Sequence, residues 1–331
     1  MKYGVIGLGA VGSIIGGMIH KSGEDIVLFG KKKQIDFLKR QGLEILGFSN
    51  KSIKLDDLKL ETDFSKLKNI DVVFICVKSQ DTEKLALEIK YFLKKETIIV
   101  SFQNGVRNKE IIKKFTGCKT ISGIILFNSV YKKPGFVNLT YKGGIVLESK
   151  DKKESKISEI LKNACFKTID VNDIKGYLYS KLVVNLQIAV TALTNQTITE
   201  SIKDDCTREI LVKTINEGIN VIENSNIKLK TLPDIDPKKM VKRMKNLNKI
   251  ILNLGTRFMG IKKDARNSMW QSLNRKKPTE IDFINGEIVR LAEKNNLDAP
   301  INKKLVELIK KAESSEVSYY DSKKLKEILG I

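Results

Sequence analysis

Residues 3–12 read YGVIGLGAVG, and they determine how the first half of the chain folds. The apolar run at residues 3–6 predicts a strand, and residues 10–21 predict a helix. Between them, Gly7, Gly9 and Gly12 have the spacing of a turn that holds a pyrophosphate against backbone N–H groups at a helix N-terminus. The turn is therefore predicted to bind a dinucleotide through its six residues, Gly7, Leu8, Gly9, Ala10, Val11 and Gly12.

Each glycine of the turn has its own reason to be there. Gly7 makes the turn tight, Gly9 lets backbone approach a phosphate, and Gly12 lets the helix lie close to the strand. The alternatives are a chance glycine-rich turn and a secretory signal over residues 2–19, although a signal would need a cleavage pattern that is missing. No other run is apolar over the roughly 18 residues of a membrane span, so we expect a soluble, cytoplasmic protein without a membrane partner.

The second predicted strand, residues 25–29, is followed by Gly30 and three lysines. NAD-selective domains place an acidic residue at the end of this strand to bind the ribose hydroxyls, whereas a cation there suits the 2′-phosphate of NADP. The lysines at residues 31–33 therefore favour NADP, used as NADPH, over NAD. The alternative is a solvated lysine cluster on a surface loop.

Two continuous apolar runs, residues 71–77 and 97–102, predict parallel strands that are buried on both faces. Lys78 follows the first run, and Asn104 follows the second. Ligands of open α/β sheets bind beyond the carboxyl ends of the strands, so both residues are candidates for a binding crevice. The alternatives are a surface lysine and a turn-forming asparagine. Residues 120–148 predict an antiparallel extension of the same sheet.

Helical periodicity replaces the strand pattern in the second half of the chain. The expected helices cover residues 177–193, 206–227, 237–254, 279–296 and 302–312, with Thr279 as an N-cap and Asp282 at the capping-box position. The sequence thus predicts an α/β protein with two domains: a dinucleotide-binding domain at residues 1–172 and an all-helical domain at residues 173–331.

The composition limits the chemistry. The 331-residue chain has a net charge of +21, four cysteines and one histidine. Lysines and arginines are spread along the whole chain, which favours a basic surface that attracts anionic ligands over nucleic-acid binding. The cysteines form no CxxC or Cys/His cluster, so no metal site is expected. His20 lies late in the first helix, which leaves acid–base chemistry to other residue types.

Lys181 and Asn185 are four residues apart, so they project from one face of a predicted helix. The rest of this helix is mostly apolar, which predicts that it is buried. Burial penalises the charged form of lysine, and a buried lysine is therefore a candidate for function. The alternative is a lysine near the helix start that extends to solvent.

Motifs over nearly the whole chain resemble those of the ketopantoate reductase (2-dehydropantoate 2-reductase) family. They are the glycine turn, Val77-Lys78, Gln103-Asn104-Gly105, residues 179–185 (YSKLVVN), Ser268-Met269 with Gln271, and residues 279–286 (TEIDFING). The resemblance implies a Rossmann domain and a helical domain like the C-terminal domain of 6-phosphogluconate dehydrogenase, with the reaction in the cleft between them. It also implies an NADPH-dependent oxidoreductase that reduces 2-dehydropantoate to pantoate, a step of pantothenate and coenzyme A biosynthesis.

The resemblance also implies roles in catalysis and substrate binding. Lys181 matches the catalytic lysine of the family, and Glu280 matches its carboxylate partner, which is also expected at the cofactor. Asn185 and Ser268 match residues that hold the substrate.

Three further residues match positions at the cofactor. Lys78 and Asn104 match residues at the junction of cofactor and substrate, and Asn104 is expected to contact both. Lys31 matches a basic residue at the 2′-phosphate of NADP.

One position departs from the family pattern. Ala189 stands where the family usually carries a second substrate-binding asparagine, one helical turn beyond Asn185. A methyl group cannot replace the hydrogen bonds of an amide, so a different branched 2-oxo acid is an alternative substrate. A further alternative is a protein without enzymatic activity that senses NADP or binds a polyanion. The apolar helices of the second domain leave room for a homodimer.

Overall fold

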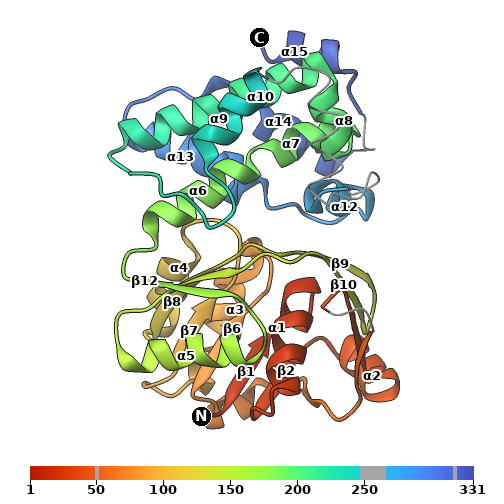
Figure 1. Cartoon of the computed structure of the whole chain (residues 1–331), viewed down its shortest axis with the longest axis vertical. Coiled ribbons are helices and arrows are strands. Elements are labelled where there is room, and N and C mark those ends of the chain that lie inside the picture. Colours follow the sequence, from red (N-terminus) through yellow and green to blue (C-terminus); the bar gives the residue numbers. More distant parts are fainter. Residues whose placement is uncertain (49–51, 247–265, 316–318) are drawn as a thin grey trace. The chain divides into compact units, whose positions relative to one another are not determined.

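The computed structural model describes residues 1–48, 52–246, 266–315 and 319–331, which fold into two compact units (Figure 1). Unit 1 comprises Met1–Gln103 and Arg107–Ile174, and unit 2 comprises Asn104–Val106 and Lys175–Ile331. The units divide between Ile174 and Lys175. The predicted boundary between residues 172 and 173 stays a prediction. The segment 104–106, which the sequence assigns to the first domain, counts with unit 2.

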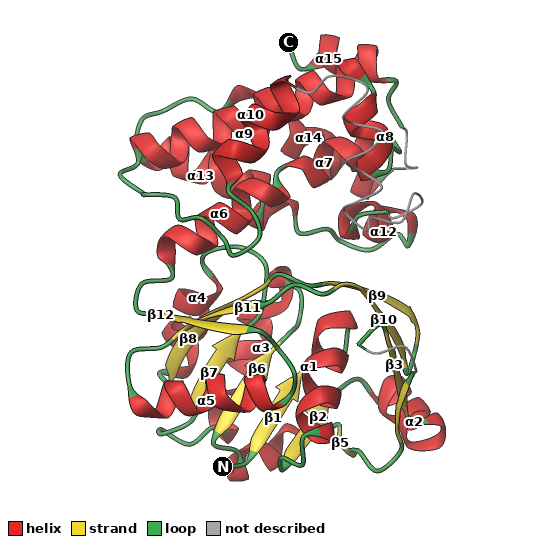
Figure 2. Ribbon diagram, viewed as in Figure 1, coloured by secondary structure: helices red, strands yellow, loops and turns green. Residues whose placement is uncertain are grey.

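Unit 1 is built on a mostly parallel sheet with the strand order β12-β11-β8-β7-β6-β1-β2-β5 (Figure 2). Strand β11 runs antiparallel to β8, and the other neighbouring strands are parallel. Because β1 lies between β6 and β2, the turn after β1 is at a topological switch point, where α/β sheets bind ligands. The strands are β1 (Tyr3–Ile6), β2 (Ile26–Phe29), β5 (Lys59–Glu61), β6 (Val72–Ile75), β7 (Ile98–Ser101), β8 (Lys119–Ile125), β11 (Ile145–Glu148) and β12 (Thr168–Val171).

Helices cover both faces of this sheet, because alternate residues of each buried strand point to opposite faces. Val5, Phe74 and Val100 belong to one core cluster, with residues of α1 and α5. Ile6 and Ile75 belong to a second cluster, with residues of α3 and α4. The helical segments of unit 1 are α1 (Ala10–Lys21), α2 (Lys32–Gln41), η1 (Phe64–Asn69), η2 (Ser79–Asp81), α3 (Thr82–Ile89), η3 (Lys90–Phe92), α4 (Asn108–Thr116) and α5 (Lys152–Asn163).

A second, four-stranded sheet in unit 1 corrects one expectation. Residues 120–148 do not all extend the main sheet: only β8 and β11 do so. Strands β9 (Asn128–Lys133) and β10 (Phe136–Tyr141) instead form a sheet with β3 (Leu43–Leu46) and β4 (Ile53–Leu55), in the order β4-β3-β10-β9. The predicted α/β sheet with helices on it is otherwise confirmed.

The regular elements in the described part of unit 2 are helices, as predicted (Figure 2). Its core gathers apolar residues of α6, α7, α9, α13 and α14. The helical segments are α6 (Lys175–Asn185), α7 (Gln187–Leu193), α8 (Ile198–Lys203), α9 (Asp205–Asn224), α10 (Pro237–Asn246), α12 (Ser268–Asn274), η4 (Ile281–Phe283), α13 (Asn285–Lys294), α14 (Pro300–Ser314) and α15 (Ser322–Ile328).

Two predicted helices of unit 2 have different bounds in the structure. The helix expected at 177–193 is interrupted at Leu186, which separates α6 from α7. The helix expected from residue 279 begins only at Asn285, because the Thr279 hydroxyl accepts the backbone N–H of Ile281 and a 3₁₀ turn follows. Asp282 forms an ion pair with Lys310 instead of a capping box. Residues 247–254 of the helix predicted at 237–254 lie outside the described residues.

Within the described ranges, no helix has both the length and the apolar character that a membrane span requires.

Candidate active site

The glycine turn has the geometry that its sequence predicts. Gly7 has a φ of +98°, and a Cβ atom there would lie 2.7 Å from the backbone nitrogen of Val77. A Cβ atom at Gly12 would lie 2.1 Å from the carbonyl oxygen of Gly7, so any side chain would push α1 away from β1. A Cβ atom at Gly9 would meet nothing within 4 Å, which leaves its outer surface open to a ligand. Each glycine therefore occupies the kind of position that dinucleotide binding requires.

The first turn of α1 suits an anion. Gly9 is its N-cap, no side chain caps the backbone N–H groups, and the first turn holds no acidic residue. Helix N-termini carry a partial positive charge and unsatisfied N–H donors, which a pyrophosphate would accept. These residues fit the phosphates of a dinucleotide.

Lys31 and Lys78 lie at strand ends of unit 1. Lys31 follows β2 after Gly30 and is the exposed N-cap residue of α2. Lys78 follows β6 as the N-cap residue of η2 and is half-buried. Both residues lie near strand ends of the sheet, and their predicted contacts with a cofactor stay predictions.

Lys181 lies in the middle of α6, and its environment changes its acidity. The residue keeps some exposed surface, but protein atoms surround its ammonium group. The resulting loss of hydration lowers the pKa of Lys181 from 10.5 to about 8. Such a lysine remains mostly protonated at neutral pH, yet it gives up its proton far more readily than a lysine in water.

Three polar side chains of unit 2 form a chain of hydrogen bonds. The Nδ2 of Asn104 donates to a carboxylate oxygen of Glu280 at 3.3 Å. The Nδ2 of Asn185 donates to the Oδ1 of Asn104 at 3.4 Å. Residues 104, 185 and 280 are far apart in the sequence, so the fold brings together three of the predicted site residues. Asn185 also lies one helical turn from Lys181 on α6.

The predicted pairing of Lys181 with Glu280 stays a prediction. Burial lowers the pKa of Lys181, whereas a nearby carboxylate would raise it. Glu280 accepts a hydrogen bond from Asn104.

Ser268 is the first residue of α12 and is exposed. The preceding residue, Asn267, holds this helix start in place. Its side chain accepts the backbone N–H of Trp270 at 2.8 Å and donates to the carbonyl of Ile188 and to Thr191 Oγ1 of α7. The sequence did not single out Asn267, although an asparagine before a helix is a common N-cap signal.

Arg266 and Trp270 form a second contact beside Ser268. The guanidinium of Arg266 lies 5.0 Å from the centre of the Trp270 ring and donates to the backbone carbonyl of Asn195. The indole N–H of Trp270 donates to Asn195 Oδ1 at 2.8 Å. Arg266 thus fixes α12 against the end of α7, and nothing in the sequence pattern shows this pairing.

Ala189, the position that departs from the family pattern, has no exposed surface. It packs in the hydrophobic core of unit 2. At this position the core therefore holds a methyl group where the family usually carries an amide.

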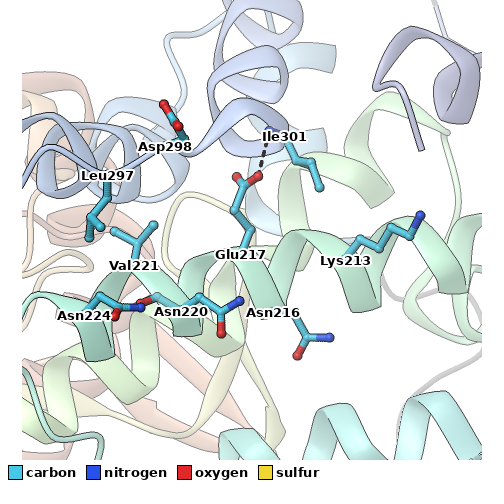
Figure 3. Close-up of a pocket in the computed structure, with 9 residues that line it drawn as sticks. All are labelled: Lys213, Asn216, Glu217, Asn220, Val221, Asn224, Leu297, Asp298 and Ile301. Atoms are coloured by element: carbon cyan, nitrogen blue, oxygen red, sulfur yellow. Dashed lines mark hydrogen bonds between the residues drawn. The ribbon is translucent and has the colours of Figure 1, made fainter.

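A pocket of about 350 Å³ in unit 2 lies apart from the predicted site residues. It is lined by residues of α9 and of the segment that leads into α14 (Figure 3). The carboxylate of Glu217 points from α9 to that segment, where it accepts the backbone N–H groups of Ile301 and Asn302. Glu217 thus caps the start of α14, and this use of its oxygens is structural.

The two units together define a class of protein. A glycine turn at the switch point of a parallel sheet, joined in one chain to a helical unit with a lysine of lowered pKa, is typical of two-domain, dinucleotide-binding oxidoreductases. Sequence comparison identifies the family within this class. The model of the family "Ketopantoate reductase PanE/ApbA" matches residues 3–152, and that of its C-terminal part matches residues 173–313. The chain belongs to the ketopantoate reductase family.

Individual relatives agree with this assignment. The 2-dehydropantoate 2-reductase of Pyrococcus horikoshii is 31% identical over 319 residues, which cover 95% of this chain and 98% of the relative. The enzyme of the same name from Archaeoglobus fulgidus is 28% identical over 315 residues, or 94% and 97% of the two chains.

Solved structures share the fold over nearly the whole chain. A ketopantoate reductase from Ralstonia eutropha has a TM-score of 0.83 at 24% identity, over 95% of this chain and 99% of the other. D-mandelate dehydrogenase with NADH and anilino(oxo)acetate has a TM-score of 0.79 at 25% identity, also over 95% and 99%.

Proposed function

We propose that the protein reduces 2-dehydropantoate to pantoate with NADPH, a step of pantothenate and coenzyme A biosynthesis. The observation that carries this proposal is the lysine on α6 whose pKa burial lowers to about 8, one helical turn from the Asn185–Asn104–Glu280 chain. The relatives named 2-dehydropantoate 2-reductase support the choice of substrate.

The chemistry follows from where charge develops. A dinucleotide held at the glycine turn, residues 7–12, would supply a hydride to C2 of the 2-oxo acid, and negative charge would then grow on the carbonyl oxygen. The Lys181 ammonium stabilises that oxygen and transfers its proton to it, which completes the alcohol. Such general-acid catalysis is worth about 10²–10⁴-fold in rate. The lowered pKa of Lys181 brings its proton-donating strength close to what the reaction needs at neutral pH.

Other residues would position the substrate. Asn185 and Ser268 offer neutral donors and acceptors for its hydroxyl and carboxylate groups. Asn104, held by Glu280, presents its amide in a fixed orientation, because both ends of that amide are hydrogen-bonded.

The choice of NADPH rests on Lys31. This exposed lysine stands at the end of β2, where an NAD-selective domain would carry a carboxylate. A cation at that point attracts the 2′-phosphate of NADPH and offers NADH no equivalent contact.

A second candidate is the reduction of a different branched 2-oxo acid on the same scaffold. Two observations favour it: Ala189 is buried and apolar, and the similar D-mandelate dehydrogenase has been solved with NADH and anilino(oxo)acetate. This candidate keeps Lys181 as the proton donor and changes only the side chain that the substrate carries.

A spectrophotometric panel of 2-oxo acids, each with NADPH and with NADH, tests both candidates. We expect the highest kcat/KM with 2-dehydropantoate and NADPH. A higher kcat/KM with another branched or aromatic 2-oxo acid would favour the second candidate. No dinucleotide oxidation with any of them, combined with salt-dependent binding to generic DNA, would instead indicate a protein that binds polyanions.

A further inference from the structure

Five buried polar side chains form a cluster near the carboxyl ends of two central strands of unit 1. They come from the last residue of β7, from the segments that follow β6 and β7, and from the first residues of α3 and α4 (Figure 1). Each is between 1% and 8% exposed: Ser79, Thr82, Ser101, Gln103 and Asn108.

Thr82 is at the centre of this network. Its hydroxyl accepts the Nε2 of Gln103 at 2.7 Å and donates to the Oδ1 of Asn108 at 2.9 Å. Ser101 Oγ donates to the other end of the Gln103 amide at 3.0 Å, and Asn108 Nδ2 donates to Ser79 Oγ at 3.1 Å. The Thr82 hydroxyl thus uses both its donor and its acceptor capacity within the network.

The network ends next to predicted site residues on both sides. Ser79 directly follows Lys78, and Gln103 directly precedes Asn104. Asn108 closes the loop that contains Asn104 and begins α4. Buried polar groups are expensive to leave without partners, so the network resists any shift of these backbone segments.

We propose that Thr82 is a positioning residue for dinucleotide binding and catalysis. It holds the turn after β6 and the turn after β7 at a fixed spacing, so that Lys78 and Asn104 are in place before the anionic ligand arrives. The inference rests on the proposed function only for the roles of Lys78 and Asn104. Pre-organisation of this kind lowers the entropic cost of binding, because the groups are already ordered.

Three variants separate positioning from stability. Thr82→Val keeps the shape of the side chain and removes both hydrogen bonds, whereas Thr82→Ser keeps the hydroxyl. Thr97→Val is the matched control: Thr97 is also fully buried, it donates to the carbonyl of Ile70 at 3.2 Å, and it lies just before the other end of β7. Each variant is assayed well below its own Tm, after circular dichroism has shown that it is folded.

We expect Thr82→Val to weaken NADPH binding, measured by fluorescence titration, and to lower kcat/KM about tenfold, since small misplacements of positioned groups have effects of this size. Thr82→Ser and Thr97→Val should stay within about twofold of the wild type. If Thr82→Val does not fold, Ser101→Ala removes only the outer hydrogen bond to Gln103, and we expect it to lower kcat/KM about threefold.

A double-mutant cycle tests whether Thr82 acts through Lys78. If it does, Thr82→Val should weaken NADPH binding much less in a Lys78→Ala background than in the wild type, because coupled residues are not additive. Additive effects of Thr82→Val and Lys78→Ala on NADPH affinity, or equal losses of affinity in Thr82→Val and Thr97→Val, would overturn this inference but not the proposed function. Wild-type protein that binds neither NADPH nor NADH would overturn the proposed function, and the inference with it.

Discussion

The ammonium of Lys181 combines two requirements that usually conflict. It has to be charged to stabilise an oxyanion, and it has to be desolvated for that charge to act strongly. In this structure, burial lowers its pKa to about 8. The lysine is therefore still mostly protonated at neutral pH, although its pKa is only slightly above that pH.

The first prediction concerns Lys181→Ala. This change should lower kcat by about 10²–10⁴-fold, because it removes the proton donor and the charge that stabilises the developing alkoxide. The affinity for NADPH, measured by fluorescence titration, should stay within a few-fold. Lys203→Ala, at an exposed lysine of α8, is the control and should change neither quantity. Equal losses of affinity and turnover in Lys181→Ala would indicate a structural lysine.

The second prediction concerns pH. Since the pKa of Lys181 is lowered to about 8, the acid form dominates below that value and disappears above it. The kcat for 2-oxo acid reduction should therefore be high at neutral pH and fall as the pH rises through about 8. The residual activity of Lys181→Ala should lack this decline. A rate that rises over the same pH range would contradict the role of Lys181 as an acid.

At the scale of elements, the strand, turn and helix at the N-terminus follow the sequence closely. Strand β1 and helix α1 have the predicted bounds, since glycine spacing and apolar periodicity are local signals. The small sheet could not be foreseen in this way. Its strands β3 and β10 pair across about ninety residues of chain and are only 4 and 6 residues long, so no local pattern records their partnership.

Helix boundaries in unit 2 show the same limit. A continuous apolar pattern predicted one helix through Leu186, but α6 ends at Asn185 and α7 begins at Gln187. At this break, the side chain of Asn285, the first residue of α13, donates to the backbone carbonyl of Leu186. The site residues on α6 were predictable as one helix face. The hydrogen bond from Asn185 to Asn104, which comes from the other half of the sequence, depends on the tertiary fold.

The third prediction compares two glycines of the same turn. Gly9→Ala should keep the wild-type Tm, because Gly9 has an ordinary φ of −73° and open space around its Cβ position, but it should weaken NADPH binding at least about tenfold. Gly12→Ala should lose about 1–3 kcal/mol of unfolding free energy, since its Cβ overlaps the Gly7 carbonyl. Thermal denaturation and fluorescence titration measure the two effects. A destabilised Gly9→Ala with unchanged affinity would contradict this account.

At the scale of the whole molecule, the net charge of +21 is the dominant property. Many of the lysines pair with nearby carboxylates, such as Lys109 with Glu148, but the surplus remains. A positive surface raises the local concentration of anions and increases their association rate. Both proposed ligands, a phosphorylated dinucleotide and a 2-oxo acid, are anions.

The fourth prediction is a salt effect on the dinucleotide. The KM for NADPH should rise about three- to tenfold between about 20 and 300 mM ionic strength, because ions screen the attraction. The KM for NADH, which lacks the 2′-phosphate, should rise less, and kcat should change little. Steady-state assays in sodium chloride measure all three quantities. Equal salt dependence for the two dinucleotides would argue against a cation at the 2′-phosphate.

The contribution of Asn104–Val106 to unit 2 has a consequence for recombination between relatives. Val106 packs against the helical core and Asn104 bonds to Glu280 and Asn185, although both lie within the sequence of unit 1. A chimera that exchanges only residues 175–331 would therefore combine this tripeptide with a foreign helical core. A hybrid enzyme should keep the native hydrogen bond from Asn104 to Glu280 only when residues 104–106 come from the same parent as residues 175–331.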